Sequence, residues 1–312
     1  MAAKGIRKNK KKTQITWKEI NRQKVLIFWA AVFVIYGFIF CYLPLGGWLM
    51  AFQNYKPKDG LLHSQFVGLA KFQQLFSDAT FLRVIRNTLA MGIINLVFTF
   101  VMAIVFAILL NEVRSRSGKK VVQTISYLPH FLSWVVLASV VVNLFSLDGS
   151  VNQLLAGFGM DKINFLGSNQ TFQGLIIGTD IWKEFGYSSV VYLAAITSID
   201  PGLHEAAAID GASWWKRVWN VTIPGMLPII LLMAAMNLTG ILSAGFDQIY
   251  NLYSPIVYET GDVLDTYVYR IGLVGRQYSF GAAVGLCRSA VGMILLLTAN
   301  GVTKKMTGQK IF

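Results

Sequence analysis

Ionisable and aromatic side chains interrupt one of the long apolar stretches of the sequence. Asp180, Lys183, Glu184 and Tyr187 are separated by one, three or four residues, so a helix would place them close together on one side. A charge at a bilayer centre costs roughly 2.5 to 3.5 kcal/mol, so this side must meet protein or water. In one interpretation it lines a path on which Trp182 or Tyr187 stacks against a substrate and the charges bind hydroxyl groups. In the other, Lys183 forms an internal ion pair with Asp180 or Glu184 that only fixes packing.

Further polar residues could join this group. An internal pair leaves one carboxylate over, and Arg288 in the last apolar stretch is the expected partner of that carboxylate, or of one on a second subunit. A polar line also runs out of the fifth apolar stretch through Asn237 and Ser243 and could flank the same path. From that line we expect the path to include Asp247, Gln248 and Asn251.

Patterns for catalysis and metal binding are incomplete in the sequence. His204-Glu205 begins like the zinc motif HExxH, but Ala208 stands where the second histidine is needed. Ser188 and Ser189 lie in a span without an evident distant base. No GxxxxGK[ST] loop is present, so the chain is not expected to bind ATP in the P-loop manner. We expect neither an enzyme, nor a metal site, nor a cofactor in this chain.

The composition is that of an integral membrane protein. Hydrophobic residues make up 54% of the 312 residues and charged residues 14%, and the mean hydropathy is +0.53. The net charge of +13 could suggest nucleic acid, but nine of the 28 basic residues precede Val25 and none lies in a base-reading motif. The charge is instead typical of a topology signal and of contact with membrane lipid.

The hydropathy pattern predicts an all-α integral membrane protein with six transmembrane helices. A bilayer core takes about 20 apolar residues as a helix. Basic residues gather before the first stretch, between the second and third, and after the last, so both termini are expected to be cytoplasmic. Residues 1–24 then form a basic cytoplasmic segment and 25–312 a transmembrane domain. The expected spans are 25–52, 88–110, 121–145, 172–199, 226–246 and 280–302.

A polar and aromatic segment, 203–224, separates the fourth and fifth stretches. Residues 203–210 contain good helix formers, Gly211 allows a turn, and 214–221 can form a second short helix. Pro224 is expected to open the next span. A helix, glycine turn and helix between two spans would lie at the membrane surface, where another protein can grip it.

The residues of this segment also carry a family resemblance. The segment contains Glu205-Ala206-Ala207, then Asp210-Gly211-Ala212, and closes on Ile223-Pro224. In order and spacing these residues resemble the cytoplasmic EAA loop of binding-protein-dependent ABC transporter permeases. The likeness implies that 203–224 is the coupling loop, which in that family docks into a groove of the ATP-hydrolysing subunit. Where the family usually has an aromatic residue this chain has Val218, with Trp219 beside it, which puts one packing contact in doubt. The coupling residues implied are Glu205, Ala206, Ala207, Asp210, Gly211, Ala212 and Pro224.

A second likeness covers most of the chain. From residue 180 onward, and above all in 246–280, the sequence resembles the oligo- and polysaccharide branch of the carbohydrate permeases. It implies a type I importer permease fold in the bacterial cytoplasmic membrane and a second permease subunit, in a heterodimer. It also implies two ATP-binding subunits that hold ATP and Mg, and an extracytoplasmic solute-binding protein that delivers a saccharide. The alternative is an ion-coupled secondary transporter that uses Asp180, Lys183 and Glu184.

Overall fold

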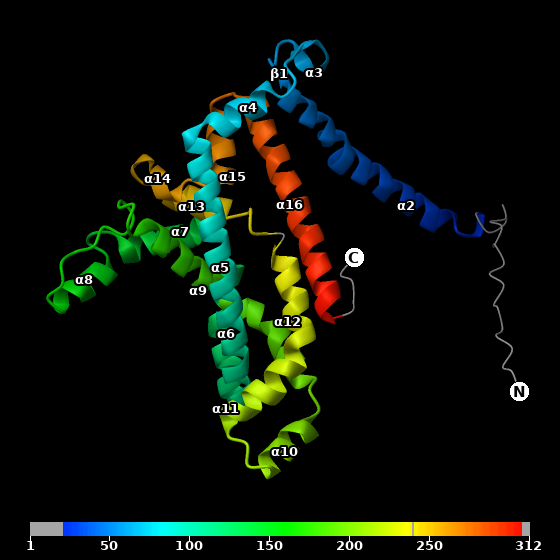
Figure 1. The fold of residues 1–312 in the computed structure, drawn as a ribbon. Helices are drawn as coiled ribbons and strands as arrows, with labels where there is room; N and C mark the ends of the chain where they lie inside the picture. Colours follow the sequence, from blue (N-terminus) through cyan, green and yellow to red (C-terminus); the bar gives the residue numbers. More distant parts are fainter. Residues whose placement is uncertain (1–20, 239, 308–312) are drawn as a thin grey trace, which may run out of the picture. The chain divides into compact units, whose positions relative to one another are not determined.

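The computed structural model describes residues 21–238 and 240–307, and most of them are helical (Figure 1). The chain divides into two compact units, 1–49 and 50–312. In the first unit, none of the described side chains in the helical segments α2 (Lys24–Gly37) and η1 (Phe38–Tyr42) is buried. Their sequence is apolar on all sides, as expected of a helix that meets lipid. The 3₁₀ helix η2 (Leu43–Phe52) crosses the boundary between the units.

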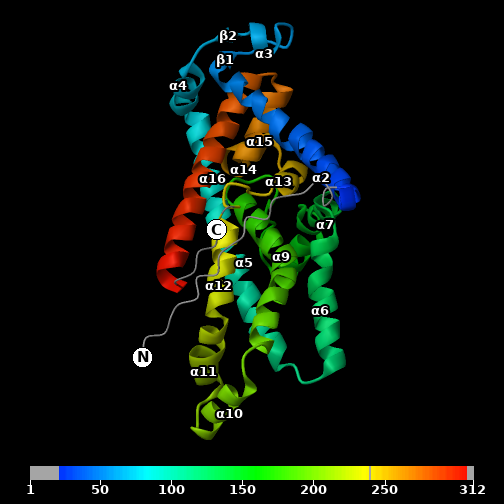
Figure 2. The same cartoon turned by 90° about the vertical axis from the view of Figure 1, so that its right-hand side faces the viewer.

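The second unit begins with short elements before its long helices. β1 and β2 pair antiparallel, with Gln53 opposite Phe66. Figures 1 and 2 both show α4 at one end of the unit and α10 and α11 at the other. The elements of these two ends are β1 (Gln53–Asn54), α3 (Gly60–His63), β2 (Gln65–Phe66), α4 (Ala70–Ser77), α10 (Pro201–Ile209) and α11 (Trp214–Arg217).

Two long helices form the centre of the second unit, α5 (Ala79–Glu112) and α9 (Phe172–Thr197). α5 begins well before residue 88, where the sequence predicts the second span to start. The Asp78 carboxylate accepts a 2.8 Å hydrogen bond from the Thr80 backbone N–H and so caps the first turn. The hydropathy pattern shows only the apolar part of this helix.

The stretch 121–145, predicted as one span, forms two helices, α6 (Arg116–Phe131) and α7 (Trp134–Phe145). Pro129 lies in the last turn of α6, and the two residues after α6 are extended. Ser133 then caps α7, where its hydroxyl accepts from the Val136 N–H at 3.4 Å. The structure thus has a complete helix break shortly after Pro129.

The fifth predicted span, 226–246, is too long at its far end. α12 (Ile223–Leu238) ends early, and α13 (Phe246–Leu252) starts a new helix. Gly245 between them has a φ of 74°, a left-handed conformation that glycine adopts without strain and that no helix continues through. The remaining elements are α8 (Ser150–Gly157), η3 (Val218–Thr222), η4 (Pro255–Val257), α14 (Tyr258–Gly261), α15 (Leu264–Tyr267), η5 (Val268–Val274) and α16 (Tyr278–Thr307).

Glycines allow the long helices to approach closely at two places. A Cβ atom on Gly186 of α9 would lie 2.1 Å from the backbone oxygen of Ser126 in α6. A Cβ atom on Gly92 of α5 would lie 2.2 Å from the backbone oxygen of Ile241. Both distances exclude any larger residue without movement of the backbone, so these glycines set the spacing around α5 and α9.

Among the described residues, five helical segments are long and apolar enough to cross a membrane. α9 is not among them, because Asp180, Lys183 and Glu184 lie in its central part. The six-span arrangement with both termini in the cytoplasm therefore stays a prediction. The five segments are Lys24–Phe52, Ala79–Glu112, Trp134–Gly157, Trp214–Leu238 and Tyr278–Thr298.

Candidate functional site

A cavity of about 330 Å³ lies between α5, α9 and α12 in the second unit. The α9 side of its wall carries Asp180, Glu184, Ser188 and Tyr192, which follow one another every four residues and so share one helical face. The polar residues on the opposite walls are Asn95 and Thr99 of α5, Asn237 of α12 and Ser243. The wall therefore combines polar with apolar side chains, although the helices around it are mostly apolar.

Several polar groups of this wall have no hydrogen-bond partner among the residues that the structure describes. Asn95 Oδ1 and Thr99 Oγ1 are both buried, and neither atom forms a hydrogen bond with any described residue. In that same part of the chain, Asp180 forms neither an ion pair nor a hydrogen bond and is half-buried. Because buried polar groups normally find partners, these three side chains have hydrogen-bonding capacity left for water or a ligand.

Glu184, in contrast, is held by its neighbours. His130 Nδ1 lies 2.8 Å from Glu184 Oε2, and Lys183 Nζ lies 3.2 Å from Glu184 Oε1. Lys183, which is 6% exposed, also donates a 2.8 Å hydrogen bond to the His130 backbone oxygen. The His130 ring stacks on Tyr187 with centroids 3.9 Å apart. This clasp of four residues joins α9 to the end of α6, just before the helix break.

The clasp bears on the two interpretations of the charged side of α9. Lys183 pairs with Glu184 and not with Asp180, so the internal ion pair exists and one carboxylate, Asp180, is left over. Tyr187 stacks on His130 and does not line the cavity, and neither does Trp182, which is 46% exposed. The internal ion pair is therefore present, whereas the substrate path stays a prediction, for which Asp180 and Glu184 at the cavity wall remain the candidates.

The path residues expected beyond α12 are not in the cavity wall. Gln248 is 1% exposed and donates hydrogen bonds to the Ile176 backbone oxygen at 2.7 Å and to Thr179 Oγ1 at 2.9 Å. It ties α13 to α9. Asp247 and Asn251 are exposed on α13, away from the cavity. The helix end at Leu238 causes this difference, because the polar line does not continue along one helix.

Arg288 was expected to pair with the carboxylate left over on α9, and within this chain that expectation is wrong. Its guanidinium pairs with Asp265 and donates to Ser243 Oγ at 2.5 Å. Arg288, Asp265 and Tyr269 line a second, more open cavity of about 460 Å³. Ser243 and Gly245 belong to the walls of both cavities, so the two adjoin.

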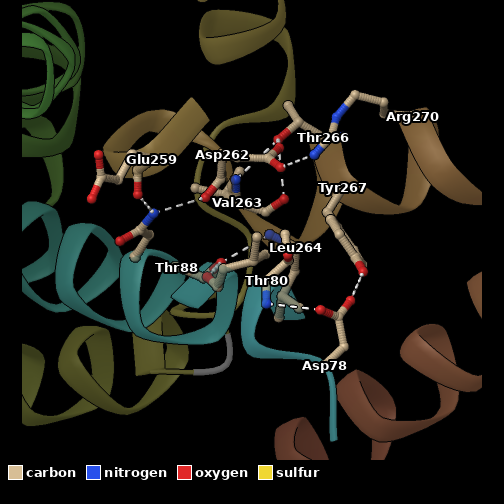
Figure 3. A network of polar contacts seen from close by, with 12 residues as sticks. Asp78, Thr80, Thr88, Glu259, Asp262, Val263, Leu264, Thr266, Tyr267 and Arg270 are labelled. Carbon is tan, nitrogen blue, oxygen red and sulfur yellow. Dashed lines mark hydrogen bonds and ion pairs between the residues drawn. The ribbon is translucent and has the colours of Figure 1, made fainter. Parts of the chain in front are cut away.

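A buried polar network at the α4 end of the unit holds α14 and α15 against α5 (Figure 3). Thr88 Oγ1 accepts from the Leu264 N–H at 2.9 Å, and Asn87 donates to the backbone oxygen of Glu259 at 2.9 Å. Asp262, which is 1% exposed, pairs with Arg270. Burial raises the pKa of the Asp262 carboxyl, although Thr266 and Arg270 act to lower it. These bonds hold the loop that contains α14 and α15 in place against α5.

The segment 203–224 forms the opposite end of the unit (Figures 1 and 2). The Asp200 carboxylate caps α10 by accepting from the Gly202 N–H at 2.9 Å, and Gly211 turns the chain with a φ of 74°. The expected helix, glycine turn and helix are present. The second helix does not stop at 221, however, because α11, η3 and α12 run on from Trp214 to Leu238 with Pro224 in the first turn of α12.

The side chains of this segment divide into an exposed and a packed set. Ile209 is 86% exposed at the end of α10. Val218 is 6% exposed and packs into an apolar cluster with residues of α5 and α9, whereas Trp219 is 64% exposed. An aliphatic residue at 218 thus fits the core of the chain itself. The residues expected to couple to a partner are exposed (Glu205, Ala206, Asp210, Gly211 and Pro224) or half-buried (Ala207 and Ala212).

Residues 100–306 match the protein family described as "Binding-protein-dependent transport system inner membrane component". The chain belongs to this family. The match includes α9, the clasp, the segment 203–224 and most of the cavity wall. The chain is accordingly a multi-pass inner-membrane permease.

The permease is similar over almost its whole length to curated proteins and to a solved structure. It is 40% identical to the polygalacturonan/rhamnogalacturonan transport system permease protein YteP of Bacillus subtilis, over 98% of this chain and 96% of YteP. It is 36% identical to Protein LplB of the same organism, over 96% and 94%. A bacterial ABC transporter involved in the import of the acidic polysaccharide alginate contains a chain that is 40% identical, with a TM-score of 0.86 over 93% and 99%.

Three polar residues of the permease's cavity wall were missed in the sequence: Asn95, Thr99 and Ser188. Asn95 and Thr99 are one helical turn apart in an otherwise apolar stretch, and Ser188 follows Glu184 by the same interval. Asn237 and Ser243 belonged to the expected polar line. Only the packing of α5 against α9 shows that these residues face one cavity.

Proposed function

We propose that the permease is the membrane-spanning subunit of an ATP-driven importer that moves an oligo- or polysaccharide along the cavity between α5, α9 and α12. The observation that carries this proposal is a cavity inside apolar helices whose wall includes Asp180, Asn95 and Thr99, three side chains with hydrogen-bonding capacity that no described residue uses. Hydroxyl groups of a sugar can donate to the Asp180 carboxylate and to the Asn95 amide oxygen. The saccharide class agrees with the names of YteP and of the alginate transporter.

The assembly proposed around this subunit has four further subunits. A second permease, in a heterodimer, closes the other side of the path. Two ATP-binding subunits hold ATP and Mg on the cytoplasmic side, and an extracytoplasmic binding protein delivers the saccharide. A solved structure of the alginate transporter in complex with a periplasmic protein that holds an alginate pentasaccharide supports such an arrangement, at 39% identity and a TM-score of 0.87.

The proposed mechanism is alternating access driven through 203–224. Closure of the paired ATP-binding subunits moves α10, with Glu205 and Asp210 as contacts to basic groups and Gly211 as the pivot. Because α11, η3 and α12 form one continuous helical segment, the motion reaches Asn237 at the cavity wall without an intervening loop. The ion-coupled alternative is weaker, since Lys183 and Glu184 are bound to each other and to His130.

The path is tested by uptake in cells that express the complete importer. Oligogalacturonate and the neutral maltotriose serve as radiolabelled probes. If the cells take up neither probe, the saccharide assignment is contradicted. For the probe that is taken up, Asp180→Ala should lower the initial rate about tenfold or more, because a hydrogen bond to a charged group is lost. Thr197→Val, on the same helix but outside the cavity wall, should leave the rate unchanged.

The coupling is tested by Gly211→Pro. Proline holds φ near −65°, which the observed φ of 74° does not allow, so the turn between α10 and α11 must change. We expect normal insertion and abundance in the membrane, ATP hydrolysis that no longer responds to the binding protein, and loss of uptake. Uptake at the wild-type rate would contradict the role of Gly211 as the pivot.

A further inference from the structure

A smaller cavity of about 190 Å³ lies at the end of the permease that carries α10 and α11. Its wall combines the ends of α5 and α9 with α10, α11 and η3. The polar residues that line it are Asn111, Glu112, His204, Arg217 and Thr222. A single water needs only ~10–15 Å³ of such space, so the cavity has room for a polar group of several atoms.

Two opposite charges in this wall, the exposed Glu112 and the half-buried Arg217, have no ion-pair partner among the described residues. Glu112 and Arg217 line the same cavity, yet in the described part of the chain neither forms an ion pair with the other or with any third residue. Arg217 Nε is buried and has no hydrogen-bond acceptor among those residues. A buried N–H without an acceptor is costly, so an acceptor from outside the chain fits here. A ligand with one negative and one positive group would satisfy both residues.

The cavity lies at the depth of lipid headgroups. Glu112 is the last residue of the apolar segment Ala79–Glu112, and Arg217 lies in the first turn of Trp214–Leu238. Trp215 and Trp219, on either side of Arg217 in the sequence, are 65% and 64% exposed. Exposed tryptophans at the ends of apolar helices are typical of the membrane–water boundary. The acyl chains of a lipid can therefore lie along the helices while its headgroup enters the cavity.

We propose that this cavity binds the headgroup of phosphatidylethanolamine. The phosphate lies against Arg217 and His204, because guanidinium groups bind phosphate through two parallel hydrogen bonds. The primary ammonium lies against Glu112 and the Asn111 amide oxygen, to which it donates. Phosphatidylcholine fits less well because its trimethylammonium group has no N–H. Phosphatidylglycerol carries the same phosphate but a neutral glycerol in place of the ammonium, so it leaves Glu112 without a cation.

The test uses the full-length tagged permease, purified in mild detergent with the subunits that accompany it. The protein is exposed to equal amounts of dioleoyl phosphatidylethanolamine, phosphatidylcholine and phosphatidylglycerol, and the retained lipids are counted by native mass spectrometry. The wild type should retain phosphatidylethanolamine in preference to both others. Arg217→Gln should lower that retention about tenfold, because the phosphate loses its guanidinium partner. Glu112→Gln should shift the preference toward phosphatidylglycerol, because Arg217 is then the remaining charged residue of the cavity.

Lys216→Gln is the matched control, since Lys216 is an exposed cation next to Arg217 and does not line the cavity. It should leave the preference unchanged. Equal retention of the three lipids by the wild type would overturn the proposal, as would an equal effect of Lys216→Gln and Arg217→Gln. Displacement of the lipid by soluble glycerophosphoethanolamine would show that the site takes the free phosphodiester, which overturns the assignment to a lipid. Loss of lipid when the ATP-binding subunits are present would overturn it for the assembled importer.

Discussion

Helix α5 carries buried polar residues in two regions that behave differently. Near α4, Asn87 and Thr88 are 2% and 0% exposed, and both bond to the loop that contains α14 and α15 (Figure 3). Two turns further along, Asn95 and Thr99 have buried oxygens without a partner in the described part of the chain. The residue types are the same in both regions. The first pair holds α5 against the loop that contains α14 and α15. The second pair has oxygen atoms that no described residue binds, so they remain available to water or a ligand.

The largest expected effect is on stability in the closed region. Asp262→Ala removes the buried partner of Arg270, and breaking a buried ion pair from one side costs about 3 kcal/mol. The free energy of unfolding, measured by denaturant titration in detergent, should fall by that amount. Asp148→Ala breaks the exposed pair with Lys162 and should change it by less than about 1 kcal/mol. Equal losses in the two variants would mean that the network of Figure 3 is no more important than a surface pair.

Two identical substitutions on α5 test the comparison directly. Thr88→Val leaves the Leu264 N–H without its acceptor and should lower the free energy of unfolding by about 1 to 3 kcal/mol. Thr99→Val removes a buried hydroxyl that has no partner, so stability should stay the same or rise slightly.

Transport should respond in the opposite order. Thr99→Val should lower the uptake rate about two- to tenfold at unchanged abundance, the loss expected for one neutral hydrogen bond to a substrate. Thr88→Val should lower uptake only in proportion to the amount of folded protein. If Thr99→Val is destabilised like Thr88→Val, the distinction between the two regions of α5 is wrong.

The smallest expected effect concerns Asp78, at the edge of the closed region. Burial raises the pKa of Asp78, but the hydrogen bonds from Tyr267 and Thr80 outweigh it and hold the pKa below its ordinary value. A lowered pKa in the folded state stabilises the protein above the unfolded pKa of about 4, and this contribution is lost as the pH falls through the folded pKa. Tyr267→Phe should therefore cost about 1 kcal/mol or less near neutral pH and nothing in acid.

The measurement is the difference in unfolding free energy between wild type and Tyr267→Phe as a function of pH. Asp262 has a raised pKa and the opposite pH dependence, but it contributes to both proteins and cancels in the difference. Tyr278→Phe is the control, because the Tyr278 hydroxyl forms no hydrogen bond among the described residues and packs edge-on against Tyr55. A difference that does not vary with pH would contradict the role of the Asp78–Tyr267 bond.

Prediction from the sequence succeeded where the signal was local. The helix, glycine turn and helix of 203–224 depend on neighbouring residues, and Gly211 adopts the conformation that its type favours. The spacing on α9 correctly indicated an internal ion pair and a carboxylate left over. It did not show that Lys183 pairs with Glu184, because the third member, His130, lies on another helix.

The remaining errors came from helix ends and from contacts between distant residues. An apolar stretch does not reveal that the helix breaks after Phe131 or that Gly245 precedes a new helix. Asp247, Gln248 and Asn251 were therefore assigned to a line that the chain does not form. Arg288 could be recognised as a charge in need of a partner. Its partner Asp265 could not, since nothing local distinguishes Asp265 from the other acids of that loop.

The sequence by itself determined the membrane class, the apolar helices and the local form of 203–224, because hydropathy, helix propensity and glycine conformation act within a few residues. Only the tertiary structure decided which polar residues have hydrogen-bond partners and which have none among the described residues. Asn87 and Asn95 are the same residue type on the same helix, and what distinguishes them is whether the loop from 259 to 264 or a cavity lies opposite. That choice depends on packing between segments more than 150 residues apart in the chain, for which the nearby sequence carries no energetic signal.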